Sequence, residues 1–122
     1  MEVSAVCRLF AKLAQMRADE VMEYIGLVKL AIQRVESELR PGVDAEKNQE
    51  LLQYVAASDA YYSYCVIRAN MLGTQSVKTG EVTITADAKS AIASAKAVRD
   101  DFYGRAAGLL RDTGFYFGST IG

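Results

Sequence analysis

Residues 88–111 read AKSAIASAKAVRDDFYGRAAGLLR, and this stretch decides the fold class. Its apolar residues recur at a spacing of three or four, which predicts one amphipathic helix. The 24 residues would span about 36 Å, whereas a compact domain of this chain length has a radius of gyration of about 14 Å. The helix must therefore cross the whole molecule, which favours an elongated bundle of antiparallel helices. Its predicted core face consists of Ala91, Ile92, Ala95, Val98, Phe102, Ala106, Leu109 and Leu110.

Three more helical patterns precede this stretch. They cover residues 3–16, 19–39 and 45–72, where apolar side chains again recur at helical spacing. The predicted buried stripes are Val6, Leu9, Phe10 and Leu13 in the first helix, Val21, Ile25, Val28, Ile32, Val35 and Leu39 in the second, and Leu51, Val55, Ser58, Tyr62, Cys65 or Val66, and Ala69 in the third.

Residues that start and stop helices mark the boundaries of these patterns. Asp19, Asp44 and Asp87 are expected N-caps, because a side-chain oxygen there can accept a hydrogen bond from a free N–H of the first turn. Pro41-Gly42 should end the second helix, and Gly73 should end the third.

The pattern changes after Gly73. Residues 75–85 predict two short strands around Thr79-Gly80, because β-forming residues flank a turn glycine. Residues 112–122 predict an extended C-terminal arm that contains Phe115-Tyr116-Phe117. The expected fold is therefore mainly α: one domain over residues 1–122, with about four helices, a β-hairpin between the third and fourth helices, and the arm.

The composition limits the classes of function. The chain has 122 residues, of which 51% are hydrophobic, so it suits one ordered domain. Its formal net charge is −1, whereas a non-specific nucleic-acid binder needs a basic surface. No apolar run reaches the roughly 20 residues of a membrane span. The first ten residues lack the layout of a signal peptide, so we expect a protein made in a cytoplasm, without a membrane partner.

Groups that could carry catalysis are scarce. The sequence contains no histidine, which removes the usual general base, the common nucleophile triads and the commonest transition-metal ligand. Asp100 and Asp101 are adjacent on a helix and point about 100° apart, so they should not form a proton-sharing dyad. We therefore expect no enzyme, and neither a catalytic nor a cofactor nor a metal site. Cys7 and Cys65 should be free thiols, and Arg99 should pack its stem while its charged head reaches solvent. The alternative for Arg99 is a buried ion pair between subunits.

Three features indicate a partner, each with a plainer alternative. A lone hairpin is marginal in water, so Val77, Val82 and Ile84 either pack on the chain's own helices or pair with a neighbouring copy. The aromatic arm, Phe115–Phe117, either folds back or adds to another subunit.

The third feature is a row of small residues on the fourth helix, away from its core face: Ala93, Ala97, Gly104 and Gly108. A glycine within a helix costs about 1 kcal/mol relative to alanine, and small side chains let another backbone approach, so we favour a subunit contact there. The third helix carries Ala56, Ala60, Tyr64, Ile67 and Met71 opposite its main stripe, which favours a central helix buried all round.

The run GTQSVKTGEVTIT (residues 73–85), followed by ADAKSAIASAKAVRDDFYGRAAGLLRDTGFYF (residues 86–117), resembles the C-terminal half of head–tail connector (adaptor) proteins of tailed bacteriophages. The shared features are a turn glycine, Gly80; a short strand, Glu81-Val82-Thr83-Ile84; a long alanine-rich helix; the leucine pair Leu109-Leu110; and an aromatic tail, Phe115-Tyr116-Phe117. The order of the earlier helices is also similar.

The resemblance implies a structural virion protein at the head–tail interface. It would form a homo-oligomeric ring, dodecameric in the family, that docks on the portal protein, extends the DNA channel and receives the next connector or tail-completion protein. Double-stranded DNA would pass through the lumen without sequence-specific binding. The alternative is a small cytoplasmic helical adaptor or regulatory protein that binds a single protein partner.

Overall fold

The computed structural model describes residues 1–76 and 86–111, and of residues 71–76 it describes the backbone alone. Within these ranges the chain forms a mainly helical bundle, as expected. The elements are α1 (Val3–Ala14), α2 (Ala18–Val21), the 3₁₀ turn η1 (Met22–Tyr24), α3 (Ile25–Glu38), α4 (Gln49–Ser76) and α5 (Ala86–Arg105). The predicted hairpin residues 77–85 and arm residues 112–122 lie outside the described ranges.

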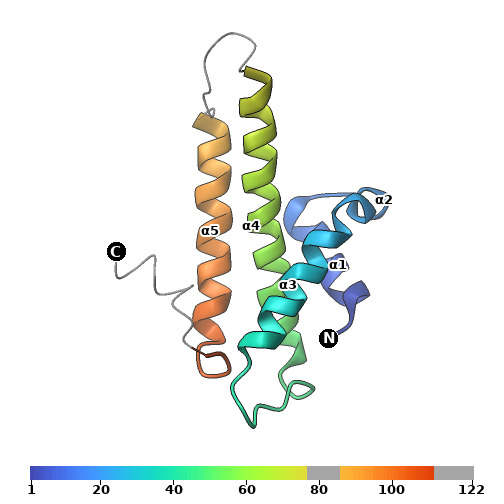
Figure 1. Ribbon diagram of the computed structural model, residues 1–122, viewed down its shortest axis with the longest axis vertical. Coiled ribbons are helices and arrows are strands. Elements are labelled where there is room, and N and C mark those ends of the chain that lie inside the picture. Colours follow the sequence, from blue (N-terminus) through green and yellow to red (C-terminus); the bar gives the residue numbers. More distant parts are fainter. Residues whose placement is uncertain (77–85, 112–122) are drawn as a thin grey trace.

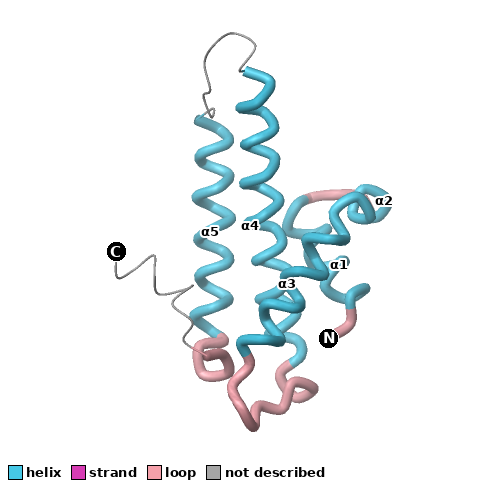
Figure 2. The backbone as a smooth tube through the Cα atoms, viewed as in Figure 1, coloured by secondary structure: helices cyan, strands magenta, loops and turns pink. Residues whose placement is uncertain are grey.

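The helix α4 is the centre of the bundle. It packs against α1, α3 and α5, whereas α5 packs mainly on α4. Figure 1 shows α4 and α5 side by side and antiparallel, with α1 and α3 on the other side of the lower half of α4. Figure 2 shows that the loops joining α3 to α4 and following α5 meet at the same end of the elongated molecule.

Burial along α4 confirms that it is central. Six consecutive residues, Val55–Ala60, are buried, which requires neighbours on every side of the helix. Three of the six are alanines, so the backbones of adjacent helices can come close to α4. Further along, Ile67 is 41% exposed, so only the lower half of α4 is buried all round.

Aromatic packing holds α1 against this centre. The side chain of Phe10 is fully buried. Its ring centroid lies 5.9 Å from that of Tyr64 on α4, in an edge-to-face arrangement, and 6.5 Å from that of Tyr24. The rings of Tyr24 and Tyr64 meet edge to face at 4.9 Å. Such pairs add to the hydrophobic stabilisation of each buried ring, so this cluster joins α1 and η1 to α4.

The predicted single helix over residues 19–39 is wrong in its first part. The chain there forms α2, then η1, and becomes regular again at Ile25. Tyr24 has φ −114° and ψ 14°, outside the helical region. The break lets its ring reach Phe10 and Tyr64, so tertiary aromatic packing overrides local helix propensity. Asp19 lies in the first turn of α2 rather than at its N-cap, and its carboxylate is 3.4 Å from Arg17.

The predicted bounds of the third helix, 45–72, are also wrong. Asp44 caps a turn, accepting a hydrogen bond from the Lys47 N–H at 3.1 Å, and α4 itself begins at Gln49. At its other end α4 continues through Gly73 to Ser76. One glycine costs only about 1 kcal/mol in a helix, too little to end one of this length. Residues 75 and 76 are therefore helical, and the predicted hairpin cannot begin at Gln75.

The fourth helix is shorter than the predicted 88–111, since α5 begins at Ala86 and ends at Arg105. Asp87 consequently lies in its first turn, not at its N-cap. After α5, the chain turns back and is held by Arg40, whose side chain donates hydrogen bonds to the carbonyl oxygens of Leu110 (2.7 Å) and Ala107 (3.5 Å). An isolated antiparallel bridge joins Leu39 to Leu110. Arg40 lies some 70 positions away from these carbonyls in the sequence. Its hydrogen bonds occupy carbonyl oxygens that would accept backbone N–H groups if α5 were longer.

We predict that Phe10→Ala lowers the free energy of unfolding by about 3–5 kcal/mol, because it removes a fully buried ring and leaves a cavity. Arg8→Ala is the matched control: Arg8 lies on the exposed side of the same helix, so its truncation should change stability by about 0.5 kcal/mol or less. Urea denaturation followed by circular dichroism measures both. Equal effects of the two substitutions would contradict the placement of α1.

Candidate assembly surface

The predicted interface residues fall into two groups. Val77, Val82, Ile84 and the aromatic residues Phe115, Tyr116 and Phe117 lie outside the described residues. Ala97, Gly104 and Gly108 are described, and all three are exposed. The structure thus places the described part of the predicted interface on the surface, on α5 and the turn that follows it.

This exposed row is a consequence of the one-sided packing of α5. The helix contacts mainly α4, through Ala95, Arg99 and Tyr103. At 100° per residue, the row lies on the opposite side of α5, where exposed serines and alanines extend it: Ser90, Ala93, Ser94 and Ala97. A Cβ built on Gly108 meets no atom of residues 1–76 or 86–111 within 4 Å. The outward side of α5 therefore carries small residues over several turns, interrupted by the exposed ion pair between Asp101 and Arg105.

The inward side of α5 differs from the prediction. Its buried residues, with those of the following turn, are Ala95, Arg99, Tyr103, Ala106 and Leu110. Ala91 is exposed, and Val98 and Phe102 are half-buried. Relative to the predicted core face, the helix is turned by about 50°, half of the angular step between successive residues. The predicted core side of α5 is thus only partly turned away from α4, and the ring of Phe102 still stacks on that of Tyr54 on α4, with centroids 5.1 Å apart.

The prediction that the head of Arg99 reaches solvent is wrong. Its side chain is 6% exposed, and its Nε and a terminal nitrogen donate hydrogen bonds to Asp100 Oδ1 at 3.3 and 3.1 Å. The guanidinium carbon lies 4.2 Å from the centre of the Tyr62 ring on α4. A carboxylate and an aromatic face together stabilise a guanidinium away from water, which explains why it stays inside.

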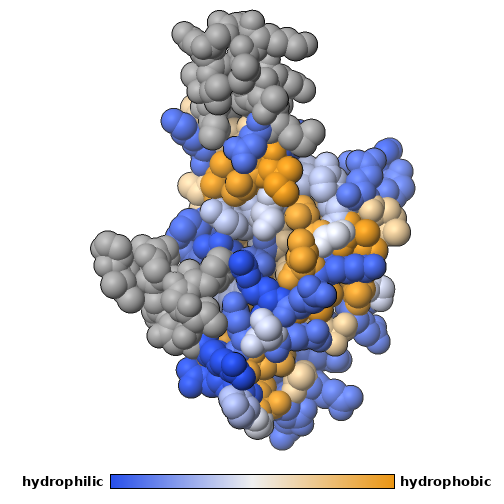
Figure 3. Space-filling model, in the orientation of Figure 1, coloured by the Kyte–Doolittle hydropathy of each residue, from blue (hydrophilic) through white to orange (hydrophobic). Residues whose placement is uncertain are grey.

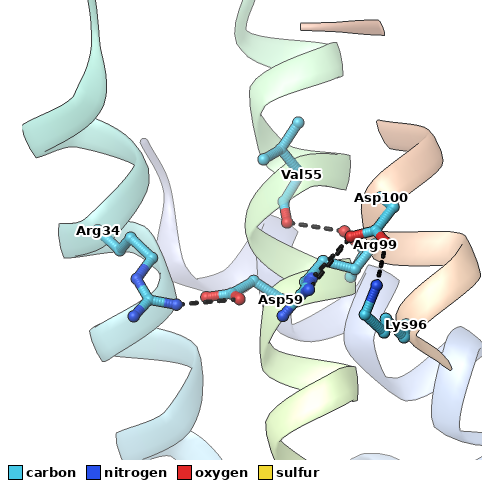
Figure 4. A network of polar contacts seen from close by, with 7 residues as sticks. Arg34, Val55, Asp59, Lys96, Arg99 and Asp100 are labelled. Carbon is cyan, nitrogen blue, oxygen red and sulfur yellow. Dashed lines mark hydrogen bonds and ion pairs between the residues drawn. The ribbon is translucent and has the colours of Figure 1, made fainter. Parts of the chain in front are cut away.

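Figure 4 shows two sets of polar contacts that lie close together, one between Arg34 on α3 and Asp59 on α4, the other among Lys96, Arg99 and Asp100 on α5. We call them together the polar network. A terminal nitrogen of Arg34 on α3 lies 3.4 Å from Asp59 Oδ1 on α4, and Lys96 Nζ lies 2.8 Å from Asp100 Oδ2 on α5. The side chain of Asp59 is 6% exposed, whereas that of Arg34 is 43% exposed. The network therefore runs from the surface of α3 into the contact between α4 and α5.

Burial changes the proton affinities of the acids in this region. It raises the pKa of Asp59 above the ordinary aspartate value, and the charges of Arg34 and Arg99 oppose that rise without overcoming it. Burial likewise raises the pKa of Glu38, with a smaller rise from the charge of Asp59. The pKa of Tyr103 is raised by burial first, and then by Asp59 and Glu38. Three helices thus share one region in which charged groups are costly.

The acidic pair behaves as two separate residues. Asp100 interacts with Lys96 and Arg99, while Asp101 accepts a hydrogen bond from Arg105 Nε at 2.9 Å on the exposed side. The two carboxylates point to different partners, as their spacing predicted.

Both cysteines are free and half-buried, and burial raises the pKa of each thiol.

Other surface features offer less to a ligand. A groove of about 460 Å³ between α1, α4 and the start of α5 is lined by Tyr61, Tyr64, Cys65, Arg68, Asp87 and four alanines. Figure 3 shows apolar surface over the upper parts of α4 and α5 and beside α3, with polar surface between. Among residues 1–76 and 86–111, no three acidic or cysteine side chains come together as metal ligands. None of the described helices combines the length and apolarity of a membrane span.

The raised pKa of Asp59 gives a pH prediction. Folded chains hold the proton more tightly than unfolded ones, whose aspartate pKa is about 3.9, so the contribution of Asp59 to stability grows as the pH falls toward its folded pKa. The free energy of unfolding of the wild type minus that of Asp59→Asn should therefore increase from pH 7 to pH 4, just above the pKa of an unfolded aspartate. Urea titrations at both values measure it, with Asp101→Asn, an exposed acid, as control. A difference that shrinks on acidification would show that the arginines dominate instead.

Comparison with known proteins gives this chain no relatives: no family model, no curated protein and no solved structure matches it.

Proposed function

We propose that this chain is a structural virion protein, a ring-forming head–tail connector of a tailed bacteriophage. Copies would join into a closed ring, dodecameric by resemblance, that docks on the portal protein and extends the DNA channel toward the tail. The next connector or tail-completion protein would bind the other side of the ring. Double-stranded DNA would pass through the lumen without sequence-specific contacts, which suits a chain with a formal net charge of −1.

The exposed side of α5 is the observation that supports assembly most strongly. A long helix usually buries one stripe and covers the opposite side with charged residues. Here the outward side carries the small residues Ala93, Ala97 and Gly104 beside the ion pair between Asp101 and Arg105, although a glycine within a helix lowers its stability. A small-residue surface lets a second helix approach closely, as in other close helix–helix contacts.

The one-sided packing of α5 fits a ring better than a two-fold dimer. A ring needs two different surfaces on each subunit, one for each neighbour. The outward side of α5 supplies one, and the opposite edge of the bundle, formed by α2 and α3, supplies the other. That edge carries Met22 at 62% and Leu30 at 63% exposure. We propose that α5 of one copy packs against the α2–α3 edge of the next.

The second candidate is a small cytoplasmic helical adaptor that binds one protein partner. The same outward side of α5 would then hold a helix of that partner, and the α2–α3 edge would stay in solvent. The two functions differ in self-association, because the adaptor predicts a monomer or dimer at every concentration.

We predict that Ala97→Gln together with Gly108→Gln abolishes self-association and leaves the fold intact. Both positions are exposed, and Gly108 has free space around its Cα, so the monomer should accept the longer side chains while a neighbouring helix cannot. Sedimentation velocity measures the oligomer, and thermal unfolding verifies the fold. Ala91→Gln is the matched control, since Ala91 is exposed but lies off the row. Unchanged oligomers in the double variant would exclude the outward side of α5 as the contact.

We also predict that removal of residues 113–122 leaves a folded helical bundle and impairs assembly. The reason is chemical: Phe115, Tyr116 and Phe117 are costly to leave in water, and an aromatic arm can add to a neighbouring subunit. Circular dichroism and sedimentation velocity measure the two effects. Loss of cooperative unfolding in the truncated chain would show that the arm belongs to the core of its own subunit.

A further inference from the structure

Helix α5 could pack on α4 in two orientations that differ by a rotation of α5 about its own axis. We call these orientations settings, and each buries different side chains. The setting predicted from apolar spacing turns Ala91, Val98 and Phe102 toward α4. The observed setting, about 50° away, turns Arg99 and Tyr103 toward α4 and leaves Ala91 exposed and Val98 half-buried. Burial of apolar surface is favourable, whereas burial of charged groups is costly. The observed setting therefore keeps an apolar contact, the Phe102 ring stacked on Tyr54, and adds a buried charged residue that needs partners.

Apolar packing between α5 and α4 depends on few large side chains. The inward half of α5 carries Ala88, Ala91 and Ala95, and the ring of Phe102 stacks on that of Tyr54 on α4 with centroids 5.1 Å apart. Helices fix their relative orientation by fitting ridges of side chains into grooves, and alanines make shallow ridges. Polar contacts between the two helices can therefore add to the selection of the observed setting.

The polar network supplies directional contacts that only the observed setting satisfies. Arg99 places its guanidinium over the Tyr62 ring on α4 and close enough to Asp59 to influence that carboxyl electrostatically. Asp59 is in turn 3.4 Å from Arg34 on α3. A rotation of α5 by about 50° would carry Arg99 away from both α4 groups, and Asp59 would lose one of its two cations while still buried.

We propose that the Arg34–Asp59–Arg99 network is a rotational lock, which fixes the side of α5 that meets α4 and therefore the side that α5 presents outward. Buried polar groups can select one arrangement of helices at a cost in stability. The lock is a property of the single chain. Its consequence, that Ala97 and Gly108 face a neighbouring copy, rests on the proposed function.

The test replaces the lock by apolar side chains of similar size, with Asp59→Leu and Arg99→Met in one chain. Asp100 keeps Lys96 as its partner, and Arg34 is partly exposed, so no buried charge is left without a partner. Single cysteines at position 91, 98 or 97, in a background where Cys7 and Cys65 are alanine, then report the orientation of α5 through their rates of thiol labelling. Ala97→Cys is the control, because position 97 is outward in both settings.

The lock predicts that the double variant still unfolds cooperatively, with a melting temperature equal to or above that of the parent. Labelling of Ala91→Cys and Val98→Cys should slow several-fold in the double variant, while labelling of Ala97→Cys stays unchanged. Equal labelling rates with and without the network would overturn the proposal, because α5 would then keep its setting unaided. Loss of cooperative unfolding would overturn it as well, since the network would then be a source of stability and not of orientation.

Labelling is measured at a protein concentration at which sedimentation velocity shows only monomers, so this result is independent of any ring. Sedimentation velocity on the double variant, without added cysteines, tests the consequence separately. Slowed labelling together with weakened assembly supports both the lock and the outward side of α5 as the contact. Slowed labelling in a protein that never self-associates supports the lock and contradicts the proposed ring.

Discussion

The middle of α4 must be buried on every side, and the arrangement of the other described helices follows from this constraint. Six consecutive buried residues, Val55–Ala60, cannot be covered by one neighbour, because they point all around the helix. Helices α1 and α3 cover one side through Phe10, Val28 and Val35, and α5 covers the other. The break at η1 and the turn held by Arg40 bring these helices onto α4.

One of these six residues is an acid, and it determines the chemistry of the contact with α5. Asp59 lies among alanines and Val55 in the most buried part of the molecule. An acid there needs cations, and it has them in Arg34 from α3 and in the charge of Arg99 from α5. The core and the orientation of α5 are therefore linked through a single carboxylate. The outward side of α5, which we propose as an assembly surface, is the opposite side of that same helix.

Sequence reasoning succeeds here where the pattern is local. Val6 and Phe10, and Val28, Ile32 and Val35, are buried as their spacing predicts, because helical periodicity places them on one side. The burial of α4 all round follows from apolar residues on both of its sides. Ala97, Gly104 and Gly108 are exposed, as expected for residues opposite a packed face.

The sequence does not predict features that depend on contacts between distant residues. Arg40 fixes the turn after α5 by a hydrogen bond to a residue about 70 positions away, and no local pattern in the sequence indicates such a bond. The spacing of apolar residues does not predict the burial of Arg99, because it counts a charged residue as one that avoids the core. Asp59 is the only charged residue between Leu51 and Ile67, and Arg99 lies four residues from both Ala95 and Tyr103 on the buried side of α5. Two opposite charges at such positions are the signal that indicates the network.

We propose self-assembly through α5, and an electron cryo-microscopy map of the purified wild-type protein would show the contact itself. We expect closed rings of one stoichiometry, in which Ala97 and Gly108 of each copy face the α2–α3 edge of the next. Particles of monomer or dimer size at every concentration, or rings whose contacts leave that side of α5 in solvent, would contradict it.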